Sequence, residues 1–576
     1  MRSRSLFTAG LLLALSTAQA QTVKNPGSLV YLTTGDWSGF DPAHTFDGSG
    51  IEILKNTLET LYLPRGASPN TYAPLLAAGN PVITNGGTTY TVQLNPKAKF
   101  SDGTPVTAAD VKYSLMRQLL MSTDDGPASL LLEPLTGSTA PIQKGDAGAF
   151  ARVDKAVVGQ GSRTVVFHLA KPFAPFTAIL ANPVAAVYSR AAAVKAGAWD
   201  GTQASWTRYV NQPLADSPYL NAPPLGSAPF VLNRYDKGSQ VILRRNDRYW
   251  RTPARLQNVV IKSVNEPSTA AQLLKTGDAD LIHVGVYPRT LLAQIKGLRN
   301  LRVTDQVASL SMQGAFFNFK VRGGNPNGVL GSAKLDGKGV PANFFSDLNV
   351  RKAFAASFDS AGYIRQQLQG GGLQAGGALI KGIAGYDPSL KYAFNKAAAI
   401  SDFKKAWGGK LWQVGFTLPL VWDSGNANHQ QAALLFKKSV ESLNPKFHID
   451  VRELQNSAII EARSQGQLPM WLGSWGADYA DAYNFAQPLL ESNGFYPQQN
   501  SYKNPKVDAL IARAVASTNP ATSTSLYRQA QRLGFADLAY LPIYQPEHFA
   551  AEQTWVKGHA VNPLSGFSAY FYTISK

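Results

Sequence analysis

The chain contains no cysteine among its 576 residues. This absence excludes disulfide bonds, thiol catalysis and metal sites built from cysteine. Histidine is also scarce, since only seven are scattered along the sequence, and neither a His-Glu-x-x-His nor a Gly-x-Ser-x-Gly motif occurs. These absences favour a binding protein over an enzyme. They predict no cofactor, no bound metal and no catalytic residues.

Long apolar runs are missing after residue 20, because none approaches the roughly 18 residues needed to span a membrane. The first twenty residues have the pattern of a secretory signal peptide. Arg2 and Arg4 precede an apolar run over residues 6–15, and residues 18–20 read Ala-Gln-Ala. A lipoprotein would need a cysteine after the cleavage point. We therefore expect a mature, periplasmic chain without a lipid anchor that starts near Gln21.

Acidic residues are outnumbered, with 37 Asp and Glu against 55 Lys and Arg, which gives a net charge of +18. Such a surplus can attract nucleic acid, an anionic membrane or an acidic ligand. The basic residues are dispersed, with pairs such as Arg244-Arg245 but no block, and no nucleic-acid-binding motif lies among them. We expect no nucleic-acid partner, and an anionic ligand is the alternative that this charge leaves.

The hydrophobic pattern indicates a mixed α/β protein. Tyr90, Val92 and Leu94 alternate as in a strand, and Asp102-Gly103 is typical of a tight turn. Thr107 and Asp110 then have the spacing of a capping box at a helix start. Later, residues 418–454 read as strand, helix and strand, which predicts a mostly parallel sheet covered by helices.

The amino-acid sequence of this strand–turn–helix segment points to a particular protein family, whereas its hydrophobic pattern predicts only secondary structure. It resembles the signature of the family 5 solute-binding proteins of bacterial ABC importers, roughly F-x-D-G-x-P-h-T-A-x-D-V-x-F-S. The matching residues are Phe100, Asp102, Gly103, Pro105, Thr107, Ala108, Asp110, Val111 and Ser114. Further blocks resemble the family at residues 226–250, 268–282, 347–359 and 541–544, although Ser227 to Phe230 departs from the family's pattern there.

The resemblance implies a two-lobed α/β periplasmic binding protein fold of type II, similar to cluster C, with an extra small α/β domain in the first lobe. Its implied divisions are the signal peptide at 1–20, first-lobe segments at 21–71, 187–287 and 545–576, the small domain at 72–186 and the second lobe at 288–544. We also expect a long Gly- and Asn-rich loop over residues 320–343, longer than is usual in the family.

Residues 471–489 are the segment where we expect ligand contact. They resemble the family's G-W-x-x-D-Y-x-D-P-x-N-F, with Ala482 in place of the proline. In peptide-binding members, the aspartate matching Asp478 holds the peptide's ammonium group. The candidate ligand-binding residues are Asp478, Trp475, Tyr479, Trp471, Trp422 and Phe40. The structural alternative is that Asp478 caps a helix and the aromatic residues belong to the core.

The resemblance implies capture without turnover, by a monomer that closes on its ligand and docks on a membrane permease. Short peptides are the expected ligands because of Asp478. An oligosaccharide or a nickel chelate remains an alternative within the family, and a secreted hydrolase is an alternative outside it.

Overall fold

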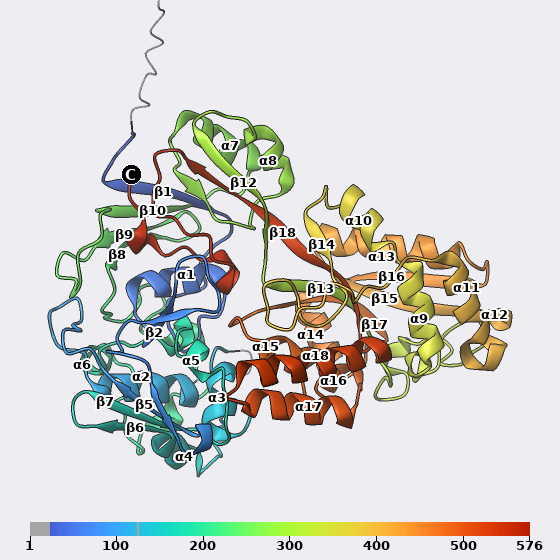
Figure 1. The fold of residues 1–576 in the computed structure, drawn as a ribbon, viewed down its shortest axis with the longest axis horizontal. Helices are drawn as coiled ribbons and strands as arrows, with labels where there is room; N and C mark the ends of the chain where they lie inside the picture. The colour runs from blue at the N-terminus through green and yellow to red at the C-terminus, as the bar shows by residue number, and fades with distance from the viewer. Residues whose placement is uncertain (1–22, 122, 124–125) are drawn as a thin grey trace, which may run out of the picture.

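The computed structural model describes residues 23–576 apart from residues 122, 124 and 125. The predicted signal peptide lies outside the described residues. Two lobes make up the molecule: the blue-to-green part of the chain builds one and the yellow-to-orange part the other (Figure 1). The α/β two-lobed architecture predicted from the sequence is confirmed. Over the described ranges, no helix has both the length and the apolar character to cross a membrane.

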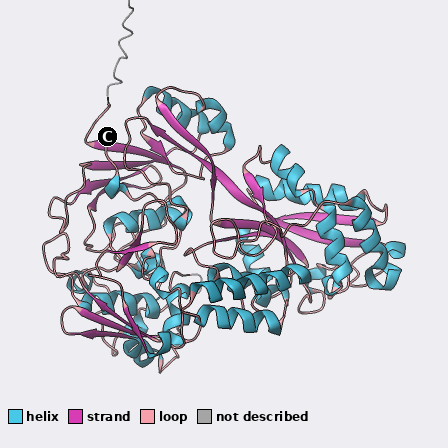
Figure 2. Cartoon of the chain, viewed as in Figure 1, coloured by secondary structure: helices cyan, strands magenta, loops and turns pink. Residues whose placement is uncertain are grey.

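One mixed sheet of twelve described strands extends through both lobes. In spatial order its main path is β16 (Phe447–Leu454), β15 (Phe416–Asp423), β17 (Met470–Gly476), β13 (Ser311–Phe317), β18 (Leu541–Gln553), β11 (Leu281–Ile282), β1 (Ser28–Thr33), β10 (Asn258–Ser263), β9 (Gln240–Arg245) and β8 (Phe230–Asp236). Two further strands, β12 (Leu301–Ala308) and β14 (Gly372–Gln374), also pair with β18. Figure 2 shows the helices packed around these strands.

Strand β18 belongs to both lobes (Figure 1). Its first half pairs with β13 and β14 of the second lobe, up to Pro546. Its second half pairs with β12 and β11 of the first lobe, from Glu547 onward. The strand is almost entirely buried, as its apolar residues Leu541, Ile543 and Phe549 require.

The passage into the second lobe lies later than the predicted residue 288. Helix α8 (Arg289–Ile295) packs against α7 (Pro267–Thr276) in a first-lobe core that also contains Leu32 and Phe549. Strand β12 joins the first-lobe half of β18. The sequence could not show this, because the contacts that hold α8 and β12 come from residues far away in the chain.

A small antiparallel sheet sits at the lower end of the first lobe in Figure 1. Its order is β4 (Val82–Thr84), β5 (Thr89–Gln93), β7 (Thr164–His168) and β6 (Val157–Gln160). The helices beside it are α2 (Ala108–Met121), α3 (Ser129–Thr136), α4 (Ala149–Ala156) and α5 (Phe176–Ile179). Helix α2 begins with the predicted capping box, in which Thr107 N and Oγ1 donate to Asp110 Oδ2 at 3.0 and 2.6 Å.

A buried ion pair ties this region to the first-lobe loop before α1 (Gly48–Thr57). Arg117 on α2 donates through two nitrogens to both oxygens of Asp41, each at 2.6 Å, and both side chains are almost fully buried. The Arg117 guanidinium and the adjacent His44 hold the pKa of the Asp41 carboxyl well below its usual range. The pair thus fixes the orientation of the small sheet relative to the first lobe.

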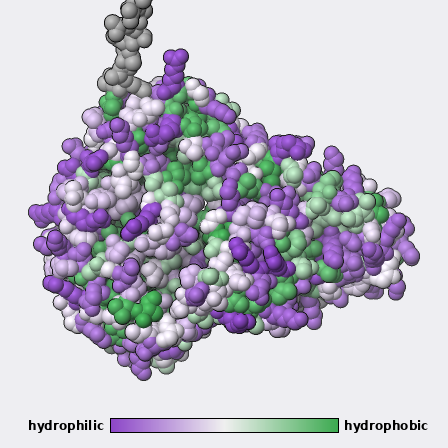
Figure 3. Space-filling view, viewed as in Figure 1, coloured by the Kyte–Doolittle hydropathy of each residue, from purple (hydrophilic) through white to green (hydrophobic). Residues whose placement is uncertain are grey.

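The second lobe has the predicted parallel arrangement, because β15 pairs in parallel with both β16 and β17. Its helices are α9 (Leu348–Ser357), α10 (Ser360–Gln366), α11 (Lys396–Lys405), α12 (Lys410–Val414), α13 (Ala427–Glu441), α14 (Asn456–Ser464), α15 (Tyr483–Leu490), α16 (Phe495–Asn500), α17 (Pro505–Ala516) and α18 (Pro520–Asp537). On the face shown in Figure 3, hydrophobic residues form patches separated by hydrophilic ones.

Hydrophobic spacing predicts other bounds for three elements. Apolar residues at helical spacing over residues 51–63 predict one helix, but α1 ends at Thr57, because the following chain pairs β2 (Tyr62–Pro64) with β3 (Tyr72–Pro74). The apolar run from Val184 predicts a strand, but the chain forms a 3-10 turn, Pro183–Ala185, before α6 (Arg190–Lys195). The apolar residues 470–472 predict a short strand, but β17 continues to Gly476, because β13 pairs with its whole length.

Candidate functional site

A large cavity lies where the end of β17 and α15 of the second lobe face α3 and its neighbours in the first. Its volume is about 1660 Å³, including the part open to solvent. Asp478, Tyr479 and Trp475 line it from the second lobe, and Phe46, Glu133 and Phe173 line it from the first. Three of the six predicted ligand-binding residues therefore lie together on this wall.

Asp478 is placed by Asn484, six residues later in the same segment. The Asp478 backbone N–H donates to Asn484 Oδ1 at 2.9 Å, and Asn484 Nδ2 donates to Asp478 Oδ2 at 3.2 Å. From the first lobe, Asn182 Nδ2 donates to the Asp478 backbone oxygen at 2.7 Å. The carboxyl group is therefore oriented by fixed neighbours while one of its oxygens has no hydrogen bond from them.

No described lysine, arginine or histidine forms an ion pair with Asp478. Burial raises the pKa of its carboxyl group to about 6, and the Asn484 amide opposes that rise only in part. A carboxylate in this position lacks the cation that would stabilise its charge. A ligand that brings a positive charge would supply one and would lower the pKa again.

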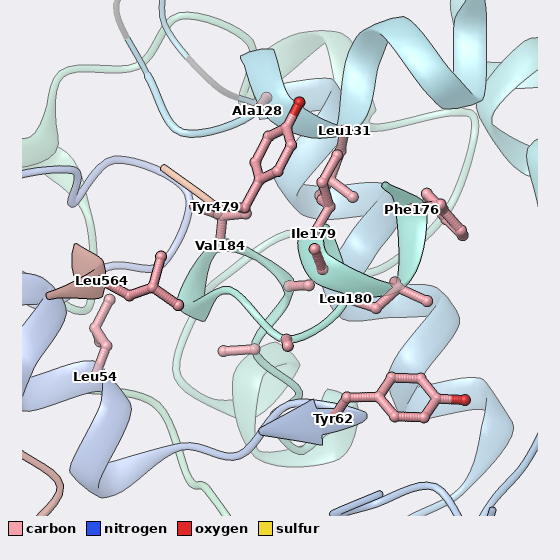
Figure 4. Close-up of a cluster of buried hydrophobic side chains, with 14 of the residues drawn as sticks. Leu54, Tyr62, Ala128, Leu131, Phe176, Ile179, Leu180, Val184, Tyr479 and Leu564 are labelled. Atoms are coloured by element: carbon pink, nitrogen blue, oxygen red, sulfur yellow. The ribbon is translucent and has the colours of Figure 1, made fainter. Parts of the chain in front are cut away.

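Tyr479 has two roles in the site. It lines the cavity, yet only 4% of it is exposed, because its ring packs between the lobes. Figure 4 shows the ring pointing toward Ala128 and Leu131. Burial and the neighbouring carboxyl groups raise the pKa of its hydroxyl well above the usual value. Tyr479 is therefore part of the contact between lobes as well as of the cavity wall.

Trp475 presents an aromatic surface to the same space. Its Nε1 donates to the Asn484 backbone oxygen at 2.5 Å, which fixes the ring. The ring also lies 5.5 Å from that of Phe495, another residue of the cavity wall. The half-buried indole can contact an apolar or cyclic part of a ligand.

The other three predicted residues do not line this cavity. Trp471 is fully buried and stacks on Phe316 with ring centroids 5.6 Å apart. Phe40 is fully buried against Tyr235. Trp422 packs in the second-lobe core and borders a separate surface pocket. All three lie apart from this cavity because their ring area is taken up by packing, which the sequence pattern of an aromatic residue does not reveal.

Several residues that shape the site were missed by the sequence analysis. Tyr483 donates its hydroxyl to both oxygens of Glu133, at 2.7 and 2.9 Å, across the gap between lobes. The Tyr483 ring also lies 5.2 Å from that of Phe173. Glu133, Phe173 and Asn182 carry no sequence signal, since nothing marks them as neighbours of α15. Asn484 does carry a sequence signal, because it belongs to the motif around Asp478.

Comparison with known proteins agrees with this architecture. The family model described as "Bacterial extracellular solute-binding proteins, family 5 Middle" matches residues 71–497. The chain is 26% identical to the probable D,D-dipeptide-binding periplasmic protein DdpA of Escherichia coli (strain K12), over 96% of this chain and 95% of that one. It is 25% identical to di/tripeptide-binding protein 2 of Pseudomonas aeruginosa (strain UCBPP-PA14), over 98% of each.

Among solved structures, the ABC transporter-associated periplasmic binding protein DppA of Helicobacter pylori, in complex with the peptide STSA, has the same fold. It superposes with a TM-score of 0.71 at 22% identity, over 95% of this chain and 98% of that one. The match of the family model covers most of the sequence, and the matched region includes Asp478 and most of the residues that line the cavity. The chain therefore belongs to family 5 of the bacterial extracellular solute-binding proteins.

Proposed function

We propose that this protein is the periplasmic binding component of an ABC importer and captures short peptides, whose α-ammonium group binds Asp478. The observation that carries the proposal is the buried, oriented and unpaired carboxyl group of Asp478 on the cavity wall. Two relatives whose names specify dipeptides or tripeptides, aligned over nearly the whole chain, support the ligand class.

The edge of β17 supports an extended ligand. Strand β15 pairs with β17 only at Val421 and Trp471, whereas β13 pairs with it as far as Gly476. Past Leu472, the edge of β17 that faces away from β13 therefore has no strand partner within the described chain. An extended peptide can add to such an edge through backbone hydrogen bonds. Asp478, just beyond the end of β17, is placed to receive the first residue of that peptide.

Delivery follows from the two-lobed architecture. A ligand in the cavity contacts both lobes, so it favours the closed arrangement in which Asn182 and Glu133 meet the second lobe. A membrane permease would then recognise the closed protein. We propose that the protein acts in this way as a monomer that binds its ligand without converting it.

The test is isothermal titration of the mature protein with trialanine and with N-acetyl-trialanine. We expect acetylation to weaken binding at least 30-fold, and Asp478→Asn to weaken trialanine binding to a similar extent, because a desolvated charge pair is worth about 2–5 kcal/mol. Asp450→Asn, which breaks a largely exposed pair with Arg452, is the matched control and should leave the affinity unchanged.

Native mass spectrometry of the purified protein identifies its natural ligand. A set of short peptides that is lost in Asp478→Asn supports the proposal. A saccharide or a nickel complex in their place, or acetylated and free peptides of equal affinity, would exclude it. Hydrolysis of the peptide would indicate an enzyme instead.

A further inference from the structure

The free end of the second lobe carries a group of lysines that the capture of a ligand does not use. Helices α11 and α12 form this end, on the side away from the first lobe (Figure 1). Five exposed lysines surround α12, and we call them the lysine patch: Lys338, Lys404, Lys405, Lys410 and Lys446. None of them lines the large cavity. Because the patch lies far from the contacts between the lobes, it stays accessible when the lobes close.

Contacts with α12 bring these lysines together from separate parts of the chain. Lys446 Nζ donates to the Gln413 backbone oxygen at 2.6 Å. Gly337, next to Lys338, lies so close to α12 that a Cβ there would be 2.8 Å from the Val414 oxygen. Helix α12 itself begins at one of the lysines, and the last turn of α11, which packs against α12, carries two more. The lysine patch is therefore one continuous surface.

The surroundings do not neutralise the charge of the lysine patch. In the described chain, no acidic residue forms an ion pair with any of the five lysines. Residues 404–414 contain three of them and no acidic residue. Asp336 and Asp402 lie in the neighbouring segments, and Asp336 accepts hydrogen bonds from Ser332 Oγ and from the Lys338 backbone. Five positive charges against two negative ones leave a surplus that attracts an anionic partner.

Aromatic and apolar side chains lie among the lysines. Trp412 is half-buried, with Lys404 Nζ 5.3 Å from the centre of its ring, and Val414 is 39% exposed. Trp407 lies in the turn between α11 and α12 at a φ of 54°, which a bulky residue rarely adopts. Backbone strain of this kind is concentrated at functional sites. Lysine combined with tryptophan is also the composition that favours the boundary between water and lipid headgroups.

The arrangement of the lysines favours a membrane over a small anion. A single phosphate or carboxylate group is held by side chains that converge on one point. The five lysines instead lie on a loop, on two helices and just before β16, and their ammonium groups are spread over the end of the lobe. An anionic lipid surface is equally extended and offers a phosphate group to each ammonium group. Its headgroup layer also accepts tryptophan and valine side chains.

We propose that the lysine patch binds the anionic headgroups of a phospholipid membrane. The contact is peripheral and reversible, since it consists of exposed ammonium groups against lipid phosphates. It holds the second lobe at the membrane surface and leaves the cavity free to open and close. The proposal does not depend on which ligand the cavity binds.

The experiment sediments the mature protein with vesicles made either of an equal mixture of phosphatidylglycerol and phosphatidylcholine or of phosphatidylcholine alone. We expect binding only to the anionic vesicles, and we expect it to weaken as salt is added, because salt screens exposed charges. Each lysine near an anionic surface contributes about a fivefold factor in affinity. The triple variant Lys404→Gln, Lys405→Gln and Lys410→Gln should therefore bind at least about 30-fold more weakly.

The matched control removes three exposed lysines of the first lobe, as Lys155→Gln, Lys195→Gln and Lys237→Gln. It has the same net charge as the patch variant and should bind the anionic vesicles like the wild-type protein. Both triple variants should keep the wild-type urea midpoint and ligand affinity, since all six lysines are exposed and outside the cavity.

Three results would overturn the proposal. An equal loss of binding in both triple variants would show that total charge attracts the vesicles. Equal binding of the wild-type protein to both kinds of vesicle would show that the lipid charge is not recognised. Absence of binding to the anionic vesicles would leave an acidic protein surface as the partner of the lysine patch. Capture of a ligand in the cavity is measured separately, so it stands or falls independently of these results.

Discussion

At the scale of single residues, the site depends on a carboxyl group that the fold orients without neutralising. Asn484 and the backbone fix Asp478, but the described residues provide no cation, and burial raises its pKa. The sequence could identify Asp478 and Asn484 because both lie in one short motif. It could not separate Trp475 from Trp471, since the two differ only in how deeply the surrounding residues bury them.

This arrangement predicts that Asp478→Asn stabilises the ligand-free protein while it removes binding. The folded-state pKa of about 6 lies above the ordinary value of 3.8, so the charged carboxylate costs stability above pH 6. We expect the substitution to raise the free energy of unfolding by about 1–2 kcal/mol at pH 7.5, allowing for partial exposure.

The pH dependence has a definite sign. Below pH 6 the native state binds the proton that the unfolded state has not yet taken up, so protonation stabilises the wild-type fold as the pH falls from 6 toward 4. The advantage of Asp478→Asn should shrink over that range, as measured by urea unfolding at several pH values. A variant less stable than wild type at pH 7.5 would show that Asp478 serves the fold.

At the scale of elements, local patterns predicted most helices and strands, and long-range pairing decided the rest. Strand β16 (Phe447–Leu454) and helix α17 (Pro505–Ala516) lie where apolar periodicity, with proline at the helix start, predicts a strand and a helix. Strand β17 extends further than predicted because β13 pairs with all of it. Helix α8 and strand β12 pack with the first lobe through contacts with distant residues, which no local pattern contains.

The junction of β13 with β18 should be sensitive to a single added methyl group. A Cβ at Gly314 would lie 2.9 Å from the Leu541 backbone oxygen, in the sheet that joins the lobes. We expect Gly314→Ala to lower the free energy of unfolding by about 1–3 kcal/mol, since a paired backbone cannot easily move away. Gly79→Ala, where the methyl group would meet no atom within 4 Å, is the control. Equal urea midpoints for both variants would contradict the close approach.

At the scale of the whole molecule, the lobes are joined by a continuous strand and meet again at the cavity. Strand β18 keeps the lobes connected in any arrangement, whereas the bonds of Asn182 and Glu133 to the second lobe require them to be together. The family resemblance predicted two lobes that close on a ligand. The contacts that close them could not be predicted, because they join segments about 300 residues apart.

Closure should therefore weaken when the hydroxyl of Tyr483 is removed. Tyr483→Phe deletes both bonds to Glu133 but keeps the ring against Phe173. Hydrogen bonds to charged groups contribute about 1.5–3 kcal/mol, so we expect peptide affinity to fall roughly tenfold or more. Small-angle X-ray scattering should show a larger radius of gyration without peptide and the wild-type value at saturation. Tyr392→Phe, whose hydroxyl donates to Phe535 within the second lobe, should change neither quantity. If Tyr483→Phe changed neither the peptide affinity nor the radius of gyration, the bond to Glu133 would contribute nothing to closure. Closure would then depend on the ligand and on the other contacts between the lobes.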